Sequence, residues 1–445
     1  MTQPRKIVSL ILSVIIVLSF AACGSSQSTT QKQNSQDTPN AVEQKKLTWA
    51  TWAISEEALK PTYMSMIETF MDKNPDVKIE AVSYPYAQYK DQLIISATAG
   101  NAPDMAHVKS EWMPELKNLG ALQDLTTVMS DELKADYFPA ILAGVTEDGK
   151  INAAPWFNNP YALYYNKVLL QKAGITELPK NWDELMEAAR KISTLGKDEN
   201  GNKIYGYAIP TSKNEPGAGY NFFPQMWAYG GDFIDKDGNI VINSPENVAA
   251  FKTAQELIKN EISPNGSTFK DLRNLFAQGV IGFYYDLEMA GGTFAEASPK
   301  GKDFANDYGV MVIPNKTGQN GHGYITEHYF AVFNTCKELD TVGKLIDHLT
   351  GPVVLQILYD AGMGKMPDRA SVTEMEIFKN PSKETTKAFV AALPSARSLP
   401  AGNAAFMQAD EAIVDALAML TISKDPVEKI VADLEGRVKE LYKKK

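Results

Sequence analysis

Residues 47–82 read LTWATWAISEEALKPTYMSMIETFMDKNPDVKIEAV, and the patterns in this stretch set the fold class. Alternation with Trp and Thr predicts a strand over Leu47–Ala53, and Val77–Val82 predicts a second strand. Between them, Ser55 is expected to cap a helix whose apolar face carries Leu59, Tyr63, Met66, Ile67 and Phe70. A strand, an amphipathic helix and another strand in succession indicate an α/β protein with a largely parallel sheet.

The rest of the chain repeats this alternation of strands and helices. Strands are expected over Ala162–Asn166, Ile204–Ile209 and Val280–Tyr285, and a helix over Trp182–Ile192 with Asn181 as its cap. The last hundred residues or so are expected to be mostly helical. About 400 residues follow the N-terminal segments, which is more than one hydrophobic core normally supports, so we expect two lobes.

The N-terminus has the pattern of an export signal. Arg5 and Lys6 precede the apolar run IVSLILSVIIVLSF (7–20), which is too short to cross a bilayer comfortably. The following Ala21-Ala22-Cys23 resembles a lipobox, although Phe20 stands where that motif usually has Leu. We predict a signal peptide over residues 1–22, followed by attachment of a diacylglycerol and an N-acyl chain to Cys23. The alternative is a plain signal peptide with an incidental cysteine.

The segment after Cys23 is strongly polar. Residues 24–45 consist mainly of Ser, Thr, Gln and Asn and cannot bury enough surface to offset their conformational entropy. Residues 23–45 are therefore predicted to be the lipidated cysteine and a disordered tether. The folded part is expected at the extracytoplasmic face of the cell membrane, held by the lipid anchor alone.

Composition and motifs argue against several classes of function. The net charge of -10, without a basic stripe, argues against a nucleic-acid partner. The sequence has neither a phosphate-binding Gly-x-x-x-x-Gly-Lys-Ser/Thr loop nor a Gly-x-Ser-x-Gly nucleophile elbow. The closest set of possible metal ligands, His322, Glu327 and His328, would need a further ligand from elsewhere, so neither a metal site nor a cofactor is expected.

Tryptophans beside Gly, Pro or Asn are the more informative feature. Trp49 and Trp182 lie within an expected strand and helix and are interpreted as core residues. Trp156 lies in an expected loop near Asn158 and Tyr161, and Trp227 lies in another near Tyr229. Aromatic faces stack against sugar rings while amides and carboxylates bind their hydroxyls, so this combination favours a carbohydrate site.

Several short motifs recur in a characteristic order from about residue 45 to the C-terminus. They are AGNAPD (99–104), LGALQDL (119–125), DGK (148–150), PW (155–156), LYYNK (163–167), PKNWDEL (179–185), GGDF (230–233), FAQG (276–279) and GKMP (364–367). Each is weak alone, but their order and spacing resemble the family 1 extracellular solute-binding proteins of ABC importers. That group contains maltose- and multiple-sugar-binding lipoproteins.

The resemblance implies a two-lobed α/β fold of the periplasmic-binding-protein type (type II), with the ligand cleft between the lobes. The first lobe is expected to comprise residues 46–156 and 313–366. The second lobe is expected to comprise residues 157–312 and 367–445, including the C-terminal helices. Crossing strands are expected to join the two.

The resemblance also implies ligand contacts. Glu111 and Trp112 follow the first-lobe motif at its sugar-contacting loop, and Trp227 matches a stacking position. Met289 departs from the family pattern, because many sugar binders carry Trp there. Together with the aromatics above, the candidate ligand-binding residues are Trp52, Glu111, Trp112, Trp156, Asn158, Asn159, Tyr161, Trp227, Asp286, His322, Tyr324, Arg369 and Phe406.

The implied function is capture of a mono- or oligosaccharide by lobe closure, followed by delivery to the transmembrane permease subunits of an ABC importer with a separate ATPase subunit. The chain is expected to act as a monomer and to catalyse no reaction. One alternative is a non-sugar solute on the same fold, such as glycerol phosphate, a peptide or a polyamine. The other is a surface-anchored glycoside hydrolase, since carboxylate pairs are too numerous to exclude it.

Overall fold

The computed structural model describes residues 44–213, 215–318, 321–363, 365–379 and 384–443. These belong to one contact unit of the chain, residues 43–445. The predicted signal peptide, Cys23 and nearly all of the predicted tether lie outside the described residues.

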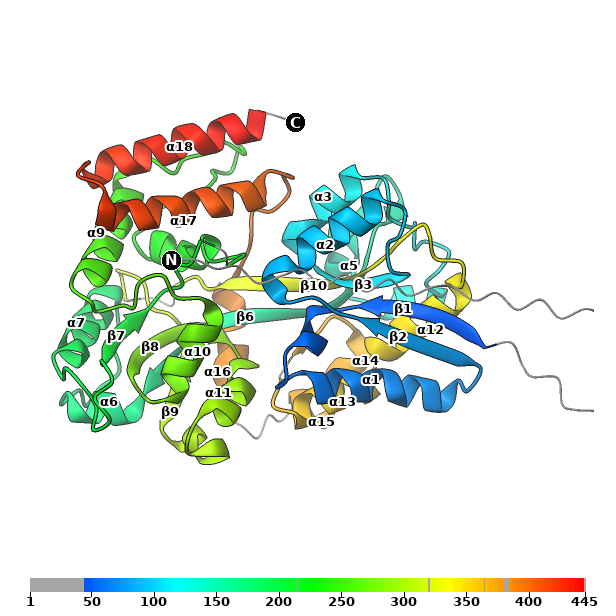
Figure 1. Ribbon diagram of the computed structural model, residues 1–445, viewed down its shortest axis with the longest axis horizontal. Coiled ribbons are helices and arrows are strands. Elements are labelled where there is room, and N and C mark those ends of the chain that lie inside the picture. Colours follow the sequence, from blue (N-terminus) through cyan, green and yellow to red (C-terminus); the bar gives the residue numbers. More distant parts are fainter. Residues whose placement is uncertain (1–43, 214, 319–320, 364, 380–383, 444–445) are drawn as a thin grey trace, which may run out of the picture. The chain divides into compact units, whose positions relative to one another are not determined.

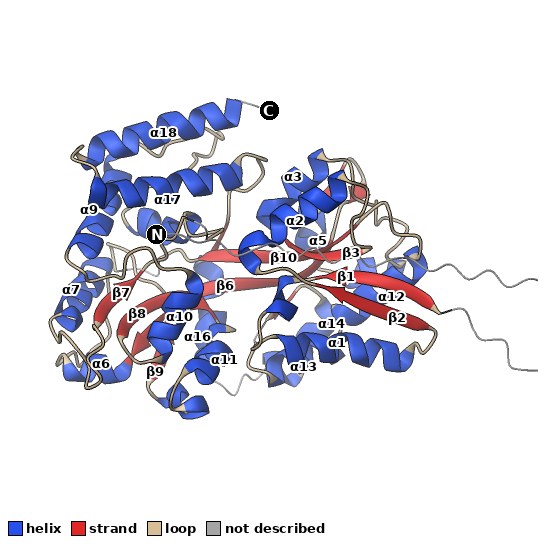
Figure 2. Ribbon diagram, viewed as in Figure 1, coloured by secondary structure: helices blue, strands red, loops and turns tan. Residues whose placement is uncertain are grey.

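A mixed β-sheet organises the described part of the chain (Figures 1 and 2). Its strands follow the order β2-β1-β3-β10-β6-β8-β7, with β9 and β11 also on β6 and β12 on β10. The bounds are β1 (Lys45–Ala50), β2 (Val77–Val82), β3 (Met105–Lys109), β6 (Ala154–Asn166), β7 (Tyr205–Ala208), β8 (Ile281–Leu287), β9 (Tyr308–Met311), β10 (Tyr324–Val332), β11 (Met366–Pro367) and β12 (Arg397–Ser398). A separate hairpin pairs β4 (Thr146–Glu147) with β5 (Lys150–Ile151).

Strands β6 and β10 join two halves of this sheet. The first half contains β2, β1 and β3, and the second half contains β8, β7 and β9. The first part of β6 pairs with β10, so that Asn158 lies opposite Glu327. Its last part pairs with β8, so that Tyr164 lies opposite Tyr284. Strand β1 is parallel to β2 and β3, and β7 is parallel to β8. At the centre, β6 and β10 are antiparallel to each other. Strand β6 is also antiparallel to β8, and β10 is antiparallel to β3. The prediction of a largely parallel sheet is therefore wrong at its centre, where the chain crosses between the halves.

The first half begins with the predicted strand, helix and strand. Helix α1 buries Tyr63, Met66, Ile67 and Phe70, as the sequence pattern predicts. It begins at Lys60, because Trp52–Ser55 form a separate 3₁₀ turn that Thr51 caps. The helices of these segments are α1 (Lys60–Lys73), α2 (Tyr86–Thr98), α3 (Met113–Asn118), α4 (Asp131–Asp136), α5 (Pro139–Gly144), α12 (Leu339–Leu349), α13 (Pro352–Asp360), α14 (Ala370–Thr373) and α15 (Glu376–Lys379).

The second half surrounds β7, β8 and β9. Asn181 caps α7 as predicted, accepting a hydrogen bond from the Glu184 N–H at 2.9 Å. Helices α9, α17 and α18 pack on one another. The helices of these segments are α6 (Lys167–Lys172), α7 (Trp182–Ser193), α8 (Phe223–Ala228), α9 (Pro245–Lys259), α10 (Phe269–Ala277), α11 (Ala290–Ala297), α16 (Glu384–Ala392), α17 (Phe406–Ile422) and α18 (Val427–Lys443).

The segment between β11 and α16 bears on the expected lobe boundary. Helix α14 packs against α13, and Arg369 bonds to Asp136 and Asp347, all within the first half. Helix α16 packs against β9 and β6 of the second half. The start of the segment 367–445, which we expected in the second lobe, thus contacts the first half, and the other lobe boundaries stay a prediction.

The hydrophobic core forms one main cluster and a smaller one in the second half around Tyr164, Phe276 and Phe294. Cys336 is buried. Within the described ranges, no helix combines the length and the apolar character needed to cross a bilayer.

Candidate ligand-binding site

A cavity of about 620 Å³ lies beside the middle of β6 and β10 and takes its walls from both halves of the fold. Trp52 and Tyr86 line it from the first half. Tyr220 and Phe269 line it from the second half, and Tyr161 lines it from β6. A volume of this size, with aromatic walls, suits a small organic solute.

Trp52 lies directly after β1, and its neighbours hold its indole plane in place. The ring stacks on His107 with centroids 3.9 Å apart, and it meets Tyr89 and Trp112 edge-on at 5.2 and 5.5 Å. Only 8% of Trp52 is exposed. Trp52 thus presents a fixed aromatic ring at the cavity wall.

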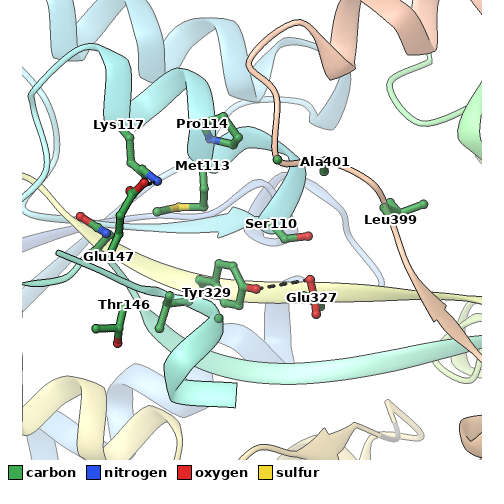
Figure 3. A pocket seen from close by; sticks show the side chains of 14 residues that line it. Ser110, Met113, Pro114, Lys117, Thr146, Glu147, Glu327, Tyr329, Leu399 and Ala401 are labelled. Carbon is green, nitrogen blue, oxygen red and sulfur yellow. Dashed lines mark hydrogen bonds and ion pairs between the residues drawn. The ribbon is translucent and has the colours of Figure 1, made fainter. Parts of the chain in front are cut away.

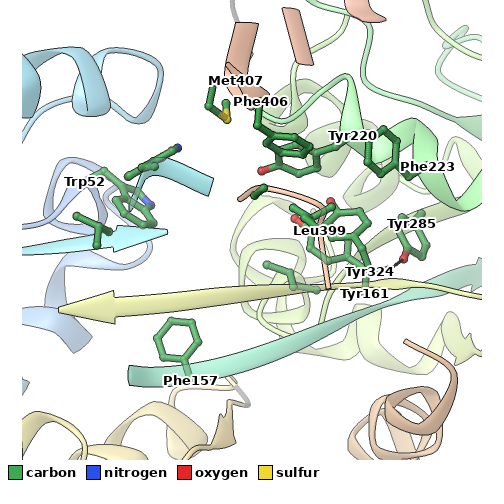
Figure 4. Close-up of a cluster of buried hydrophobic side chains, with 14 of the residues drawn as sticks. Trp52, Phe157, Tyr161, Tyr220, Phe223, Tyr285, Tyr324, Leu399, Phe406 and Met407 are labelled. Atoms are coloured by element: carbon green, nitrogen blue, oxygen red, sulfur yellow. Dashed lines mark hydrogen bonds between the residues drawn. The ribbon is translucent and has the colours of Figure 1, made fainter. Parts of the chain in front are cut away.

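Tyrosines form the wall on the second-half side (Figure 4). Tyr161 packs on Tyr324 of β10 with centroids 4.1 Å apart. Tyr220 stacks on Phe406 of α17 at 5.9 Å. Figure 4 shows these rings grouped together, with Trp52 on the first-half side. Rings fixed in this way offer flat apolar faces with hydroxyl groups at their edges.

Lys109, at the end of β3, connects the two walls. Its ammonium lies 2.6 Å from Glu111 Oε1 and donates to the Tyr220 hydroxyl at 2.6 Å and to the Tyr86 hydroxyl at 3.2 Å. The Tyr220 hydroxyl in turn donates to Glu111 at 2.7 Å. Burial by itself lowers the pKa of Lys109, but the Glu111 charge outweighs burial and leaves that pKa above its ordinary value.

Arg273 of α10 lines the cavity from the second half. It donates two N–H bonds to Asp286 of β8, at 2.8 and 3.0 Å. Asp286 is fully buried and also accepts the Leu287 N–H at 2.7 Å. Asp286 therefore orients the Arg273 guanidinium instead of lining the cavity itself.

A chain of hydrogen bonds runs from β1 to the cavity through two histidines. Thr51 Oγ1 lies 3.2 Å from His107 Nδ1, and His107 Nε2 lies 2.7 Å from His328 Nδ1. His328 Nε2 ends the chain 3.0 Å from Thr326 Oγ1, and both residues line the cavity. Burial lowers the pKa of His107 and of His328 well below the ordinary value. Both rings are therefore neutral, and they fix the Thr326 hydroxyl at the cavity wall.

A smaller cavity of about 400 Å³ lies on the other face of β10 (Figure 3). Glu327 and Tyr329 line it, whereas the alternating residues Thr326 and His328 line the larger cavity. Because the larger cavity carries the aromatic walls, we take the larger one as the candidate site.

The candidate residues from the sequence divide into three groups. Trp52 and Tyr161 line the larger cavity. Five others contact a lining residue without lining the cavity themselves, namely Glu111, Trp112, Asp286, Tyr324 and Phe406. The remaining six are not brought to the cavity, namely Trp156, Asn158, Asn159, Trp227, His322 and Arg369.

Trp227 is covered by its own neighbours. Its indole N–H donates to Asp232 at 3.0 Å, and the Arg397 guanidinium lies 4.5 Å from the ring centroid. His322 meets the ring edge-on, and its Nδ1–H donates to the Ser395 carbonyl at 2.7 Å. These contacts satisfy the polar groups of Trp227 within the protein.

The others are held inside the first half. Trp156 is buried on β6 and donates to the Leu349 carbonyl at 3.0 Å. Asn158 donates to Asp368 at 2.7 Å, and Asn159 is buried on the same strand. Most side chains of β6, a central strand, are buried.

Several lining residues are not predicted from the sequence, above all Lys109, Tyr220 and Arg273. One signal for Tyr220 existed, the small residues Gly217 and Gly219 just before it. A Cβ on Gly219 would lie 2.2 Å from the Asp410 carbonyl oxygen, so glycine is needed where this loop approaches α17. Lys109 and Arg273 offer no comparable signal, because isolated cations usually lie on solvated surfaces.

Comparison with known proteins shows the family of the chain. The sequence model of the bacterial extracellular solute-binding proteins matches residues 53–355. A binding protein of Brucella abortus is 28% identical over 344 residues, which are 76% of this chain and 80% of that protein. The diacetylchitobiose-binding protein of Streptomyces coelicolor is 25% identical over 370 residues, which are 81% of this chain and 80% of that protein.

Solved structures share the architecture. The maltose-bound MalE3 of T. maritima superposes with a TM-score of 0.76 at 26% identity, covering 89% of this chain and 99% of that one. The two-lobed periplasmic-binding-protein fold expected from the sequence is thereby confirmed. The family match spans well over half of the chain. The chain belongs to the family of bacterial extracellular solute-binding proteins.

Proposed function

We propose that this protein captures a carbohydrate as the extracytoplasmic binding component of an ABC importer. The observation that carries the proposal is a cavity whose facing aromatic walls, Trp52 and Tyr220, come from different halves of the fold. Flat rings with polar groups at their edges suit a pyranose, which has apolar faces and a rim of hydroxyls. Relatives named for diacetylchitobiose and maltose support this ligand class.

Capture proceeds by closure of the two halves about β6 and β10. In the structure the halves already touch through the Lys109–Tyr220 bond and through the Tyr86 hydroxyl, which lies 3.4 Å from the Pro216 carbonyl. A ligand shifts an opening equilibrium only by contacts that are better in one state. A sugar that touches Trp52 and Tyr220 together makes such contacts only when the halves are closed.

Selectivity follows from polar groups in the cavity walls. Trp52, Thr326 and Arg273, which carry an indole N–H, a hydroxyl and a guanidinium, line the cavity. If a bound sugar leaves one of these groups without a partner, its binding free energy is less favourable by the desolvation cost of that group, about 1–3 kcal/mol. The closed form that results is the one we propose the permease recognises.

Export and anchoring complete the proposal. The Ala21-Ala22-Cys23 motif supports cleavage before Cys23 and attachment of acyl chains to it. A tethered binder stays near its permease at high local concentration, so weak docking suffices. We propose that the chain docks as a monomer on the transmembrane subunits and that a separate subunit hydrolyses ATP.

A phosphate-bearing solute fits the cavity less well than a sugar. Three cations line it, but Lys109 is paired with Glu111 and Arg273 with Asp286. Phosphate recognition uses cations whose donors are free to point at the ligand.

Glycoside hydrolysis remains the second candidate because of one observation. Glu215 lines the cavity, and burial raises its pKa to about 7, as a general acid would require. Incubation of the purified protein with labelled oligosaccharides, followed by product analysis, separates the two functions. We expect saturable binding with the oligosaccharide recovered intact, whereas shortened products would contradict the binding proposal.

A thermal-shift screen over mono- and oligosaccharides tests the ligand class. At a ligand concentration 100 times its Kd, the gain in unfolding free energy is about 2.7 kcal/mol, which is readily seen as a rise in Tm. We expect at least one sugar to raise the Tm in a concentration-dependent way. A screen in which only phosphorylated or peptide ligands raise the Tm would contradict the proposal.

A further inference from the structure

Negative charge predominates in the larger cavity. Four glutamates line it: Glu56, Glu57, Glu215 and Glu296. In the described part of the chain, none of them forms an ion pair. They come from the loop before α1, the loop before Tyr220 and α11, so different segments of the fold contribute them.

Most of the positive charge in the cavity is already neutralised. Lys109 is tied to Glu111 at 2.6 Å, and Arg273 is tied to Asp286 through two hydrogen bonds. Lys270, exposed in the first turn of α10, is the one lining cation that forms no ion pair with the described residues. The cavity wall therefore carries several carboxyl groups and a single ammonium that form no ion pair with the described residues.

Glu56 and Glu215 are the carboxylates most affected by this imbalance. Burial raises the pKa of Glu56, against the charges of Arg273 and Lys270. Burial also raises the pKa of Glu215 to about 7. The charges of Arg273 and Lys109 lower this pKa, and the charge of Glu56 raises it further. The charge of Glu56 thus disfavours ionisation of Glu215, and for both carboxyl groups burial outweighs the attraction of the neighbouring cations.

The aromatic wall beside them already accommodates a cation. The Lys109 ammonium lies 5.7 Å from the centroid of Tyr86, 5.8 Å from that of Trp112 and 5.3 Å from that of Tyr220. Ring faces attract positive charge most strongly where water is excluded. Trp52 lines the cavity next to this wall and meets Trp112 edge-on at 5.5 Å.

We propose that the captured solute is an amino sugar, whose protonated amine lies between Glu56 and Glu215 while its ring packs against Trp52. This inference rests on the proposed carbohydrate function and narrows its substrate class. The ammonium supplies the positive charge that the cavity lacks, and the sugar ring uses the aromatic wall. A neutral sugar uses the wall alone.

Calorimetric titration with matched ligands tests the inference. The probes are glucosamine oligosaccharides linked β-1,4, their fully N-acetylated counterparts and spermidine, all at low ionic strength and pH 7.5. The two oligosaccharide series share one backbone and differ in the positive charge and the acetyl group on nitrogen. We expect the amine series to bind at least tenfold more tightly than the acetylated series.

Variants locate the charge. Glu215→Gln and Glu56→Gln keep the shape of the side chain, and each is expected to weaken amine binding about tenfold while changing the affinity for acetylated sugars less than twofold. Glu187→Gln, on the exposed face of α7, removes the same charge away from the cavity and is expected to change neither affinity.

Each result has a distinct meaning. Equal or tighter binding of the acetylated series, or amine binding that both glutamine variants leave unchanged, overturns the amino-sugar inference and leaves the carbohydrate proposal standing. Binding of spermidine without any oligosaccharide overturns both, because the inference requires a sugar ring against Trp52.

Discussion

The Lys109 ammonium donates a hydrogen bond to the Tyr220 hydroxyl at 2.6 Å and so joins the end of β3 to the loop before α8, 111 residues further along the chain. Both residues are buried, and both also contact Glu111. This three-membered network forms where the halves of the fold meet. It joins the two halves of the fold directly beside the cavity.

Tyr220→Phe is expected to weaken ligand binding by about tenfold or more. The change removes the hydroxyl that bonds to Lys109 and Glu111, and a hydrogen bond to a charged group contributes about 1.5–3 kcal/mol. Calorimetric titration with the sugar identified in the thermal-shift screen measures the effect. Tyr205→Phe on β7 is the control, because that hydroxyl bonds to no described residue. Equal losses in both variants would contradict a role of this network in closure.

Asp410→Asn is expected to flatten the pH dependence of stability. Burial and the Glu111 charge raise the pKa of Asp410 to about 7, although the Gly217 and Tyr220 N–H groups bond to it. The unfolded carboxyl titrates near its ordinary value of about 3.9. The folded protein therefore holds this proton between those values, and the contribution of Asp410 to stability is lost as the pH rises through about 7.

Urea unfolding at pH 5 and pH 8 measures this effect. The wild type should lose more unfolding free energy between the two pH values than the Asp410→Asn variant does. The variant should also be less stable at pH 5 by about 1 kcal/mol, because one backbone N–H loses its acceptor. An unchanged difference between the two pH values would show that Asp410 is already ionised at pH 5.

Arg369→Ala is expected to cost about 3 kcal/mol of stability and to leave ligand affinity unchanged. Arg369 bonds to Asp136 at 2.7 Å and to Asp347 and Thr350 at 2.9 Å, away from the cavity. Removing one partner of a mostly buried ion pair leaves the other charge uncompensated. Denaturant unfolding and titration measure both quantities, with the exposed Arg437→Ala as a control that should cost less than about 1 kcal/mol. A loss of affinity without a loss of stability would return Arg369 to the ligand site.

Trp227→Ala is also expected to act on stability. The ring is 5% exposed and lies between Arg397 and the second-half core, so truncation should cost about 3–5 kcal/mol. Ligand affinity of the folded fraction should change less than twofold. A drop in affinity of tenfold or more would place Trp227 at the ligand, as the sequence had suggested.

Much of the fold could be predicted because it depends on local patterns. The apolar face of α1, the strand Val77–Val82 and the cap of α7 all follow from residues within one or two turns of each other. The sequence predicts Trp49 and Trp182 as core residues because their segments have the patterns of a strand and a helix, and both are fully buried.

The site was less predictable because it depends on contacts between elements that only the fold brings together, such as the bond from Lys109 to Tyr220, 111 residues away. Lys109 and Arg273 look like surface residues until Glu111 and Asp286 are placed beside them, and Arg273 meets its partner only through the fold of α10 onto β8. The loop predicted around Trp156 is wrong for a related reason. Its Pro and Asn neighbours suggest a loop, but long-range pairing with β10 makes the segment a buried strand.

Calorimetric titration of the wild type and of Trp52→Leu with the selected sugar tests the central claim most directly. Leucine keeps apolar packing against His107 but removes the flat ring and its N–H from the cavity wall. We predict one sugar bound per wild-type chain and at least tenfold weaker binding by a Trp52→Leu variant that retains its circular dichroism spectrum. Equal affinities in the two proteins would contradict capture of a carbohydrate in this cavity.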